Sequence, residues 1–134
     1  MQSCDAALWQ RVYKPKRLTV LKDCITVTGR VEQIARDADG DAHMLLRLDK
    51  GQESLVNARN RKKKNGDLVV EVVCAFAPSS PKSAVRTCAG YTSPLTLPKV
   101  GDRIRATGSY VLDTHNGWNE VHPATSINVV SGAG

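Results

Sequence analysis

Residues 18–34 form one long strand-like run, LTVLKDCITVTGRVEQI, and its length limits the folds open to the chain. Apolar and polar residues alternate cleanly from Cys24 to Thr28, and the alternation shifts at Gly29. A glycine inside a strand pattern marks a bulge or a sharp bend. Small closed barrels need a long first strand that bends, because it pairs on both of its edges. The run therefore predicts an all-β fold organised around a bent first strand.

Four further strand-like runs follow, at residues 42–49, 67–74, 102–112 and 121–130. The run DLVVEVVC is apolar apart from its acids, which predicts a central strand. A basic stretch precedes this run, and an irregular connection with four prolines, residues 75–99, follows it. A chain of 134 residues is expected to form one domain. The predicted divisions are an arm at 1–17, a β-barrel at 18–131 and a flexible tail at 132–134.

Five strands, a bent first strand and a long connection after the third resemble the order of an OB-fold barrel. CITVTGRVEQI and VGDRIRATGSYVL resemble strands that are common in OB-type domains. DGDAH together with YVLDTHNGWNEVHP resembles an uncharacterised group of secreted bacterial domains with DGDxH and HGWxEIHP motifs. The resemblance covers about residues 17–129 and implies a small five-stranded OB-like barrel and secretion, but no activity. Asn116 interrupts the His-Gly-Trp triplet, so no role is assigned to His115.

Four cysteines, Cys4, Cys24, Cys74 and Cys88, favour two disulfides and an oxidising compartment, since none of them forms a CxxC motif. Three pairings are open, and the favoured one is local, Cys4 with Cys24 and Cys74 with Cys88. The second pair would contribute about 3 kcal/mol in the chain-entropy model. No apolar run is long enough to span a membrane, and the N-terminus has no signal-peptide core. A secreted or cell-surface location therefore implies a signal that has been removed.

The positive charge of the chain is concentrated in one stretch. Lys and Arg outnumber Asp and Glu by 19 to 13. Five of the positive residues are Arg59, Arg61, Lys62, Lys63 and Lys64, which leaves 14 against 13 elsewhere. Like charges in this stretch repel, so a solvated, irregular loop is expected, ending in a turn at Asn65-Gly66.

Two polar loops, Asp37–His43 and Asp113–Pro123, interrupt the strand patterns. In OB-folds the corresponding loops border the ligand-binding face. One hypothesis is a secreted, non-catalytic module that binds single-stranded nucleic acid or another acidic polymer with loops 37–43 and 113–122. Trp118 would stack on a base, and the basic residues 59 and 61–64 would neutralise phosphates. The acids of the first loop oppose this hypothesis, because they repel phosphates.

The same loops also support a hypothesis of divalent metal binding. Its candidate ligands are Asp39, Asp41, His43, Glu120 and His122. Glu120 and His122 alternate in a strand and so point to one face. We expect His43, Glu120 and His122 to lie close together, either around an ion or as a polar network that fastens the loops. A metal with an open coordination position would make the protein a metal-dependent hydrolase.

A third hypothesis is a structural subunit of an extracellular assembly that pairs through residues 1–17. Only the metal hypothesis calls for a cofactor. The sequence contains neither a GxSxG nor a GxxxxGK[ST] motif, so catalysis is the less favoured outcome.

Overall fold

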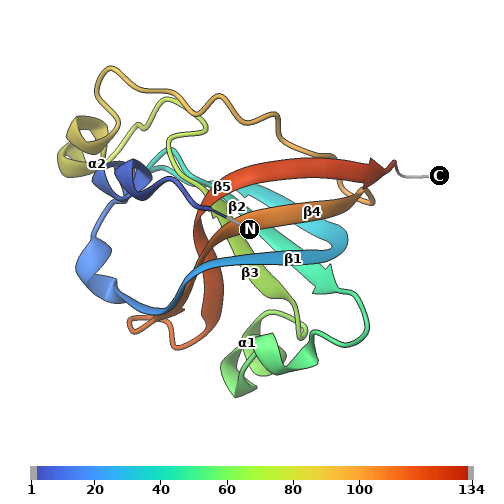
Figure 1. The fold of residues 1–134 in the computed structure, drawn as a ribbon. Helices are drawn as coiled ribbons and strands as arrows, with labels where there is room; N and C mark the ends of the chain where they lie inside the picture. Colours follow the sequence, from blue (N-terminus) through green and yellow to red (C-terminus); the bar gives the residue numbers. More distant parts are fainter. Residues whose placement is uncertain (1–2, 133–134) are drawn as a thin grey trace.

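The five strands form one sheet that closes on itself. A computed structural model describes residues 3–132 of the chain. The strands are β1 (Leu18–Arg36), β2 (Ala42–Leu48), β3 (Leu68–Val72), β4 (Arg103–Asp113) and β5 (Asn119–Ser131). Their order is β1-β2-β3-β5-β4, and the ring closes because β1 pairs with β4 as well as with β2 (Figure 1). All the pairs are antiparallel except β3 with β5. The all-β prediction is confirmed, and each strand-like run forms a strand.

The first strand bends as expected, but its irregularities do not lie at Gly29. The register against β2 shifts between Val31 and Gln33, and the register against β4 shifts between Val20 and Ile25. Gly29 has a different role, because a Cβ there would lie 2.3 Å from the carbonyl oxygen of Arg47 on β2. The glycine is therefore required by the close approach of two backbones.

Alternate residues of all five strands fill the interior of the ring. Each of the larger buried apolar side chains contributes about 1.5–3 kcal/mol by leaving water. This core includes Val27, Val31, Met44, Leu46, Leu68, Val70, Val72, Ile104, Tyr110 and Val121. Every residue of β3 is buried, including Glu71, as expected for a central strand. A carboxylate is thus placed near the end of a buried strand.

The basic stretch is helical, so the prediction of an irregular loop was wrong. It forms α1 (Ala58–Lys63), which follows the 3-10 turn η3 (Glu53–Leu55). The side chain of Asn57 accepts from the backbone of Asn60, and the Asn60 side chain accepts from the backbone of Asn57. Asn60 is fully buried and also donates to the carbonyl of Asp67. This reciprocal cap and buried anchor offset the repulsion between the basic side chains. The turn predicted at residues 65–66 is confirmed by positive φ angles at both positions.

Both predicted disulfides are confirmed. Cys4–Cys24 joins the arm to β1, and Cys74–Cys88 joins the end of β3 to α2 (Lys82–Thr87). The arm contains the 3-10 turns η1 (Ala6–Arg11) and η2 (Pro15–Arg17), and it lies along one side of the sheet, with η1 near α2 (Figure 1). Residues 1–2 of the predicted arm and residues 133–134 of the predicted tail lie outside the described residues.

The arm is packed against the rest of the chain. Val12 is buried in a second, smaller core with Val73 and the Cys74–Cys88 pair. Trp9 donates its indole N–H to the hydroxyl of Ser109, at 3.3 Å. Within residues 3–132, no helix has both the length and the apolar character needed to cross a membrane.

Candidate metal centre

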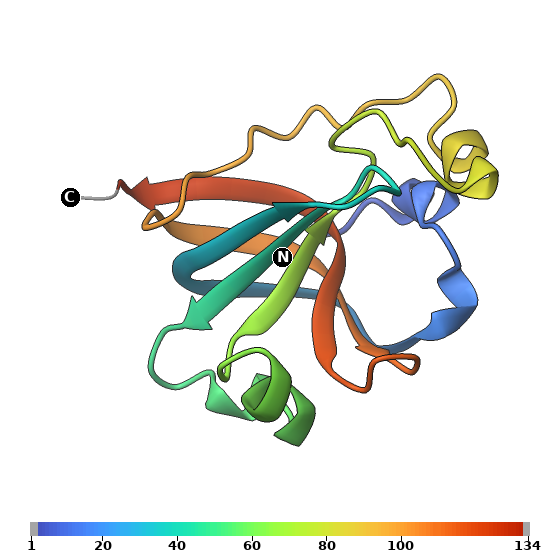
Figure 2. The ribbon, with the colours of Figure 1, turned by 180° about the vertical axis from the view of Figure 1, so that it is seen from behind.

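A cleft of about 170 Å³ opens beside the arm, where the two polar loops meet β3. Seen from behind, the turn between β4 and β5 lies next to α1 at one end of the sheet, and the arm passes close to it (Figure 2). Six carboxylates line this cleft: Asp37, Asp39, Asp41, Glu71, Asp113 and Glu120. The other ionisable lining residues, apart from Tyr13, are His43, His122, Lys14 and Arg17. The balance of charge in this cleft favours a cationic ligand.

Strand register brings the polar side chains together. The pairing of β2 with β3 sets His43 opposite Glu71. The parallel pairing of β3 with β5 sets Val69 beside Glu120, which brings the polar end of β5 next to Glu71. Residues from three strands that are distant in the sequence therefore meet at one point.

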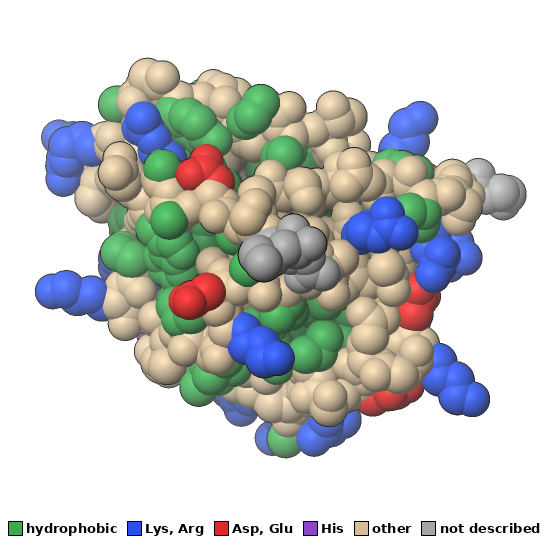
Figure 3. Space-filling model, viewed as in Figure 1, with side chains coloured by type: hydrophobic (Ala, Val, Ile, Leu, Met, Phe, Trp, Pro, Cys, Tyr) green, Lys and Arg blue, Asp and Glu red, His purple; other side chains and the backbone are tan. Residues whose placement is uncertain are grey.

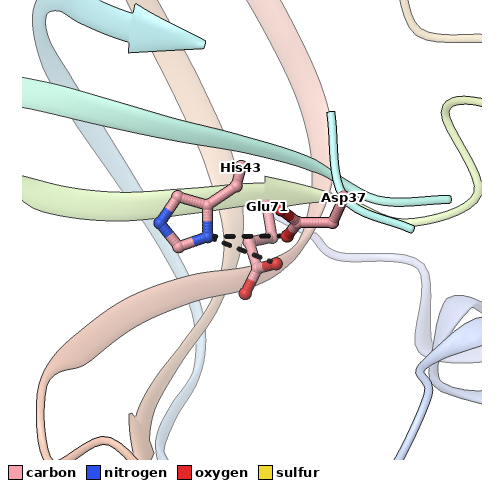
Figure 4. A group of neighbouring side chains, drawn as sticks. All are labelled: Asp37, His43 and Glu71. Atoms are coloured by element: carbon pink, nitrogen blue, oxygen red, sulfur yellow. Dashed lines mark ion pairs between the residues drawn. The ribbon is translucent and has the colours of Figure 1, made fainter. Parts of the chain in front are cut away.

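Glu71 lies between the two histidines. Its Oε2 is 2.9 Å from Nδ1 of His122, and its Oε1 is 3.7 Å from Nδ1 of His43. Asp37 approaches the same His43 nitrogen at 3.9 Å, so side chains from β2, β3 and the β1–β2 loop converge (Figure 4). The sequence analysis did not include Glu71 among the candidate ligands. The signal was present, because Glu71 is the one charged residue between Leu68 and Val73.

Glu120 lies behind His122 and also contacts Trp118. Its Oε1 is 2.9 Å from Nδ1 of His122, and its Oε2 accepts a hydrogen bond from the Trp118 indole at 2.7 Å. Lys64 places its ammonium 4.3 Å from the centroid of the Trp118 ring. Trp118 is therefore engaged at its edge and over one face, which limits its use as a stacking platform for a base.

The first polar loop brings Asp41 to the other side of His122. Asp41 Oδ1 accepts from the backbone amide of Cys74, and Asp41 Oδ2 lies 3.9 Å from Nε2 of His122. Asp39 stabilises the turn instead, because its Oδ1 accepts from the backbone of Asp41. Nε2 of His122 is buried and has no hydrogen-bond partner among residues 3–132.

Burial and the neighbouring charges shift the pKa values of these groups in different directions. Burial and the neighbouring Glu71 charge raise the pKa of Asp41 to about 8 and the pKa of Glu120 to about 7. Burial also opposes ionisation of Glu71, but His122 and His43 outweigh it and hold the Glu71 pKa well below its usual value. Burial disfavours the charged His122 ring, yet Glu71 and Glu120 raise the His122 pKa well above its usual value. Near neutral pH, a charged His122–Glu71 pair therefore stands among acids that retain protons.

Glu71 connects the residues that were expected to lie close together. Glu120 and His122 are in direct contact, as expected, and His43 is linked to them through Glu71. Within residues 3–132, two groups have ligand atoms that all lie within 4.8 Å of one another. The inner group is Asp41, Glu71 and His122, and the outer group is Asp37, His43 and Glu71. The predicted candidates Asp39 and Glu120 belong to neither group.

The predicted ligand-binding basic residues have different environments. Arg59 donates to the carbonyl of Asn116 at 3.1 Å and contacts the β4–β5 turn, while Arg61 donates to a carbonyl of the preceding segment. Lys62 and Lys63 are exposed. On the face shown in Figure 3, Lys and Arg side chains are scattered and form no continuous patch. His115 is also exposed, outside the cleft.

The chain matches no protein-family model and no curated protein.

Proposed function

We propose that the protein is an OB-like barrel domain that binds a divalent metal ion with Asp41, Glu71 and His122. The observation that carries the proposal is the unpaired Nε2 of His122, a residue only 6% exposed. Leaving a buried polar atom without a partner costs about 1–3 kcal/mol. The 3.9 Å between this nitrogen and Asp41 Oδ2 is too long for a hydrogen bond. Two ligands that each lie about 2.0–2.2 Å from one ion can be up to about 4.4 Å apart, so an ion fits between them.

The opposite side of the His122 ring supports the same proposal. Metal-binding histidines donate their second ring N–H to a carboxylate, which orients the ring. Nδ1 of His122 lies 2.9 Å from both Glu120 Oε1 and Glu71 Oε2, and the Trp118 indole donates to the other oxygen of Glu120. In this proposal, Glu120 keeps its contact with Nδ1 and orients the His122 ring, while Glu71 turns from Nδ1 to bind the ion at Nε2.

The donor set indicates which ions to test. One imidazole and two carboxylates suit ions that accept both nitrogen and oxygen, such as Zn²⁺ and Mn²⁺. An all-oxygen set would have suited Ca²⁺ or Mg²⁺ better.

We further propose that the protein is extracellular, and this location and the OB-like fold each have their own support. A ring of five strands that places its polar loops around one cleft agrees with the way OB-folds position ligand contacts. Two disulfides in a small β-rich chain fit an oxidising compartment.

Calorimetry on the metal-stripped, disulfide-intact chain tests the proposal. We expect saturable binding of Zn²⁺ or Mn²⁺ that is lost in Asp41→Asn and in His122→Gln. His115→Gln is the matched control, because His115 is exposed and lies outside the cleft. Circular dichroism of each variant separates lost binding from lost folding. Absence of binding by the folded wild-type chain would reject the proposal.

Binding of an acidic polymer is a second candidate, favoured by the exposed basic side chains of α1. Arg61, Lys62 and Lys63 project from this helix, beside the turn that Arg59 contacts. The acidic cleft would repel phosphates, so we place a nucleic acid or other polyanion on α1 and not in the cleft.

Anisotropy of a labelled single-stranded oligonucleotide, measured at low and moderate salt with EDTA, tests this candidate. Neutralising residues 61–63 to Gln should weaken binding and make the log–log salt slope shallower by about 2–3. Lys82→Gln with Arg86→Gln on α2 is the control, because both side chains are exposed. If the triple variant on α1 and the double variant on α2 have the same affinity and the same salt slope, this candidate fails.

Assembly through the arm finds less support. The Cys4–Cys24 bond and the buried Val12 hold the arm on its own sheet. Strand exchange with a neighbouring molecule would have to break this packing.

A further inference from the structure

Glu71 presents its two carboxylate oxygens to two different histidines. Oε2 faces His122, which belongs to the inner group, and Oε1 faces His43, which belongs to the outer group. A carboxylate in this position can bind one ion through each oxygen. Glu71 is also the one residue that the two groups share.

The outer group has the spacing of ligands around an ion. His43 Nδ1 lies 3.7 Å from Glu71 and 3.9 Å from Asp37 Oδ2 (Figure 4). Both distances exceed those of hydrogen bonds and are ion-pair distances. Both fall within the span of up to about 4.4 Å for two ligands of one ion. Each group thus supplies one imidazole, one aspartate and a share of Glu71.

The outer group is more open to solvent than the inner group. Asp37 has 42% of its side chain exposed, whereas the side chains of His122 and Glu71 are 8% and 10% exposed. An ion therefore has a path from solvent to Asp37 and His43.

We propose that Asp37, His43 and Glu71 bind a second divalent ion, which Glu71 bridges to the ion of the inner group. This inference rests on the proposed function, since it needs an ion at Asp41, Glu71 and His122. It defines the site as a two-ion centre for Zn²⁺ or Mn²⁺, with one imidazole for each ion. Nε2 of His122, which is buried and has no hydrogen-bond partner within residues 3–132, supports an ion at the inner group.

Stoichiometry tests the inference on the full, disulfide-intact chain. After metal removal and reloading with Zn²⁺, elemental analysis and calorimetry should give two ions per wild-type chain. Asp37→Asn and His43→Gln should each reduce this to one ion. Asp41→Asn should retain the outer ion, and Glu71→Gln should lose or weaken both.

EPR spectroscopy of the Mn²⁺-loaded chain adds a second test, because it reports whether two bound ions lie close together. Two Mn²⁺ ions bridged by a carboxylate should give an exchange-coupled EPR spectrum in the wild-type chain. Asp37→Asn should convert this spectrum to the signal of an isolated ion. The control is Asp23→Asn, because Asp23 is exposed and lies outside the metal cleft.

The outcomes separate the two proposals. One ion per wild-type chain, lost in Asp41→Asn, would overturn the second ion and leave the proposed function standing. No bound ion would overturn both. Two ions that both persist in Asp37→Asn and His43→Gln would overturn the placement of the second ion.

Discussion

Glu71 is a charged residue in a buried strand, and its role depends on the histidines beside it. The chain keeps it ionised because His122 and His43 hold its pKa well below the usual value. Its 7% exposure leaves little room for water to replace these partners. A buried charge is tolerated only while its partners remain.

Removing Glu71 should therefore destabilise the metal-free chain. We expect Glu71→Gln to lower the free energy of unfolding by about 3–5 kcal/mol at neutral pH, because His122 loses its main counter-charge. Urea denaturation in EDTA measures the change. Glu53→Gln, at an exposed site, should stay within about 0.5 kcal/mol of the wild type. An equally small effect of Glu71→Gln would show that His122 is neutral in the folded chain.

The buried acids predict how stability depends on pH. The pKa values of Asp41 and Glu120 rise from 3.8 and 4.5 to about 8 and about 7, so the folded chain retains protons that the unfolded chain releases. The raised pKa of His122 acts in the same direction, because its stabilisation is complete below 6.5 and is lost as the pH rises through the folded value. The depressed pKa of Glu71 matters only below about 4.5, where its stabilisation is lost as the pH falls.

Between pH 6 and pH 8.5, the metal-free chain should therefore become less stable. Urea midpoints measured in EDTA at the two pH values check this. Saturating Zn²⁺ should reverse the trend, since ion binding requires deprotonated ligands. A midpoint that does not change with pH in EDTA would contradict the assignment of buried protons.

At the scale of elements, α1 shows how a local cap can override a charge pattern. Asn60 links the helix to the sheet, because its side chain donates to the carbonyls of Asp67 and Asn119. It also accepts from the backbone amide of Asn119 at the start of β5. The helix is thus anchored to the two strands that carry Glu71 and Glu120.

Asn60→Ala should destabilise the fold by about 2 kcal/mol or more, because it removes a cap and leaves buried backbone groups without partners. Thermal or urea unfolding measures the loss. Lys62→Ala, on the exposed side of the same helix, should have almost no effect. Equal effects of the two changes would indicate that the anchor contributes nothing.

The sequence predicted the elements that depend on residues close together in the chain. Alternation located the strands, and the number of cysteines with their local spacing indicated the correct disulfides. The role of Glu71 could not be predicted, because it depends on the register between β3 and its two neighbours. The cap of α1 was also missed, since Asn57 and Asn60 gain their effect from burial against β5, which is distant in the sequence.

At the scale of the whole molecule, the cleft depends on the Cys74–Cys88 bond. The backbone amide of Cys74 donates to Asp41 Oδ1, which leaves Oδ2 directed at His122. Backbone bonds from Phe76 and Ser79 to Gly40 and Ala38 fix the same loop from the segment inside this disulfide.

Breaking this disulfide should weaken ion binding. Cys74→Ser with Cys88→Ser should lower the Zn²⁺ affinity by about tenfold or more, as expected when support around a ligand is lost. Calorimetry on folded protein measures the change. Cys4→Ser with Cys24→Ser is the matched control, because that bond ties the arm to β1 and contributes no contact to Asp41. Equal losses in the two double variants would point to general destabilisation.

The contact between the Cys74 amide and Asp41 ties the proposed metal site to the redox state of the chain. While the cysteines are reduced, the loop that carries Asp41 would lack its covalent support, and the proposed ligands would be poorly arranged. Under the proposed function, disulfide formation would therefore precede metal loading, and the chain would take up its ion in an oxidising compartment.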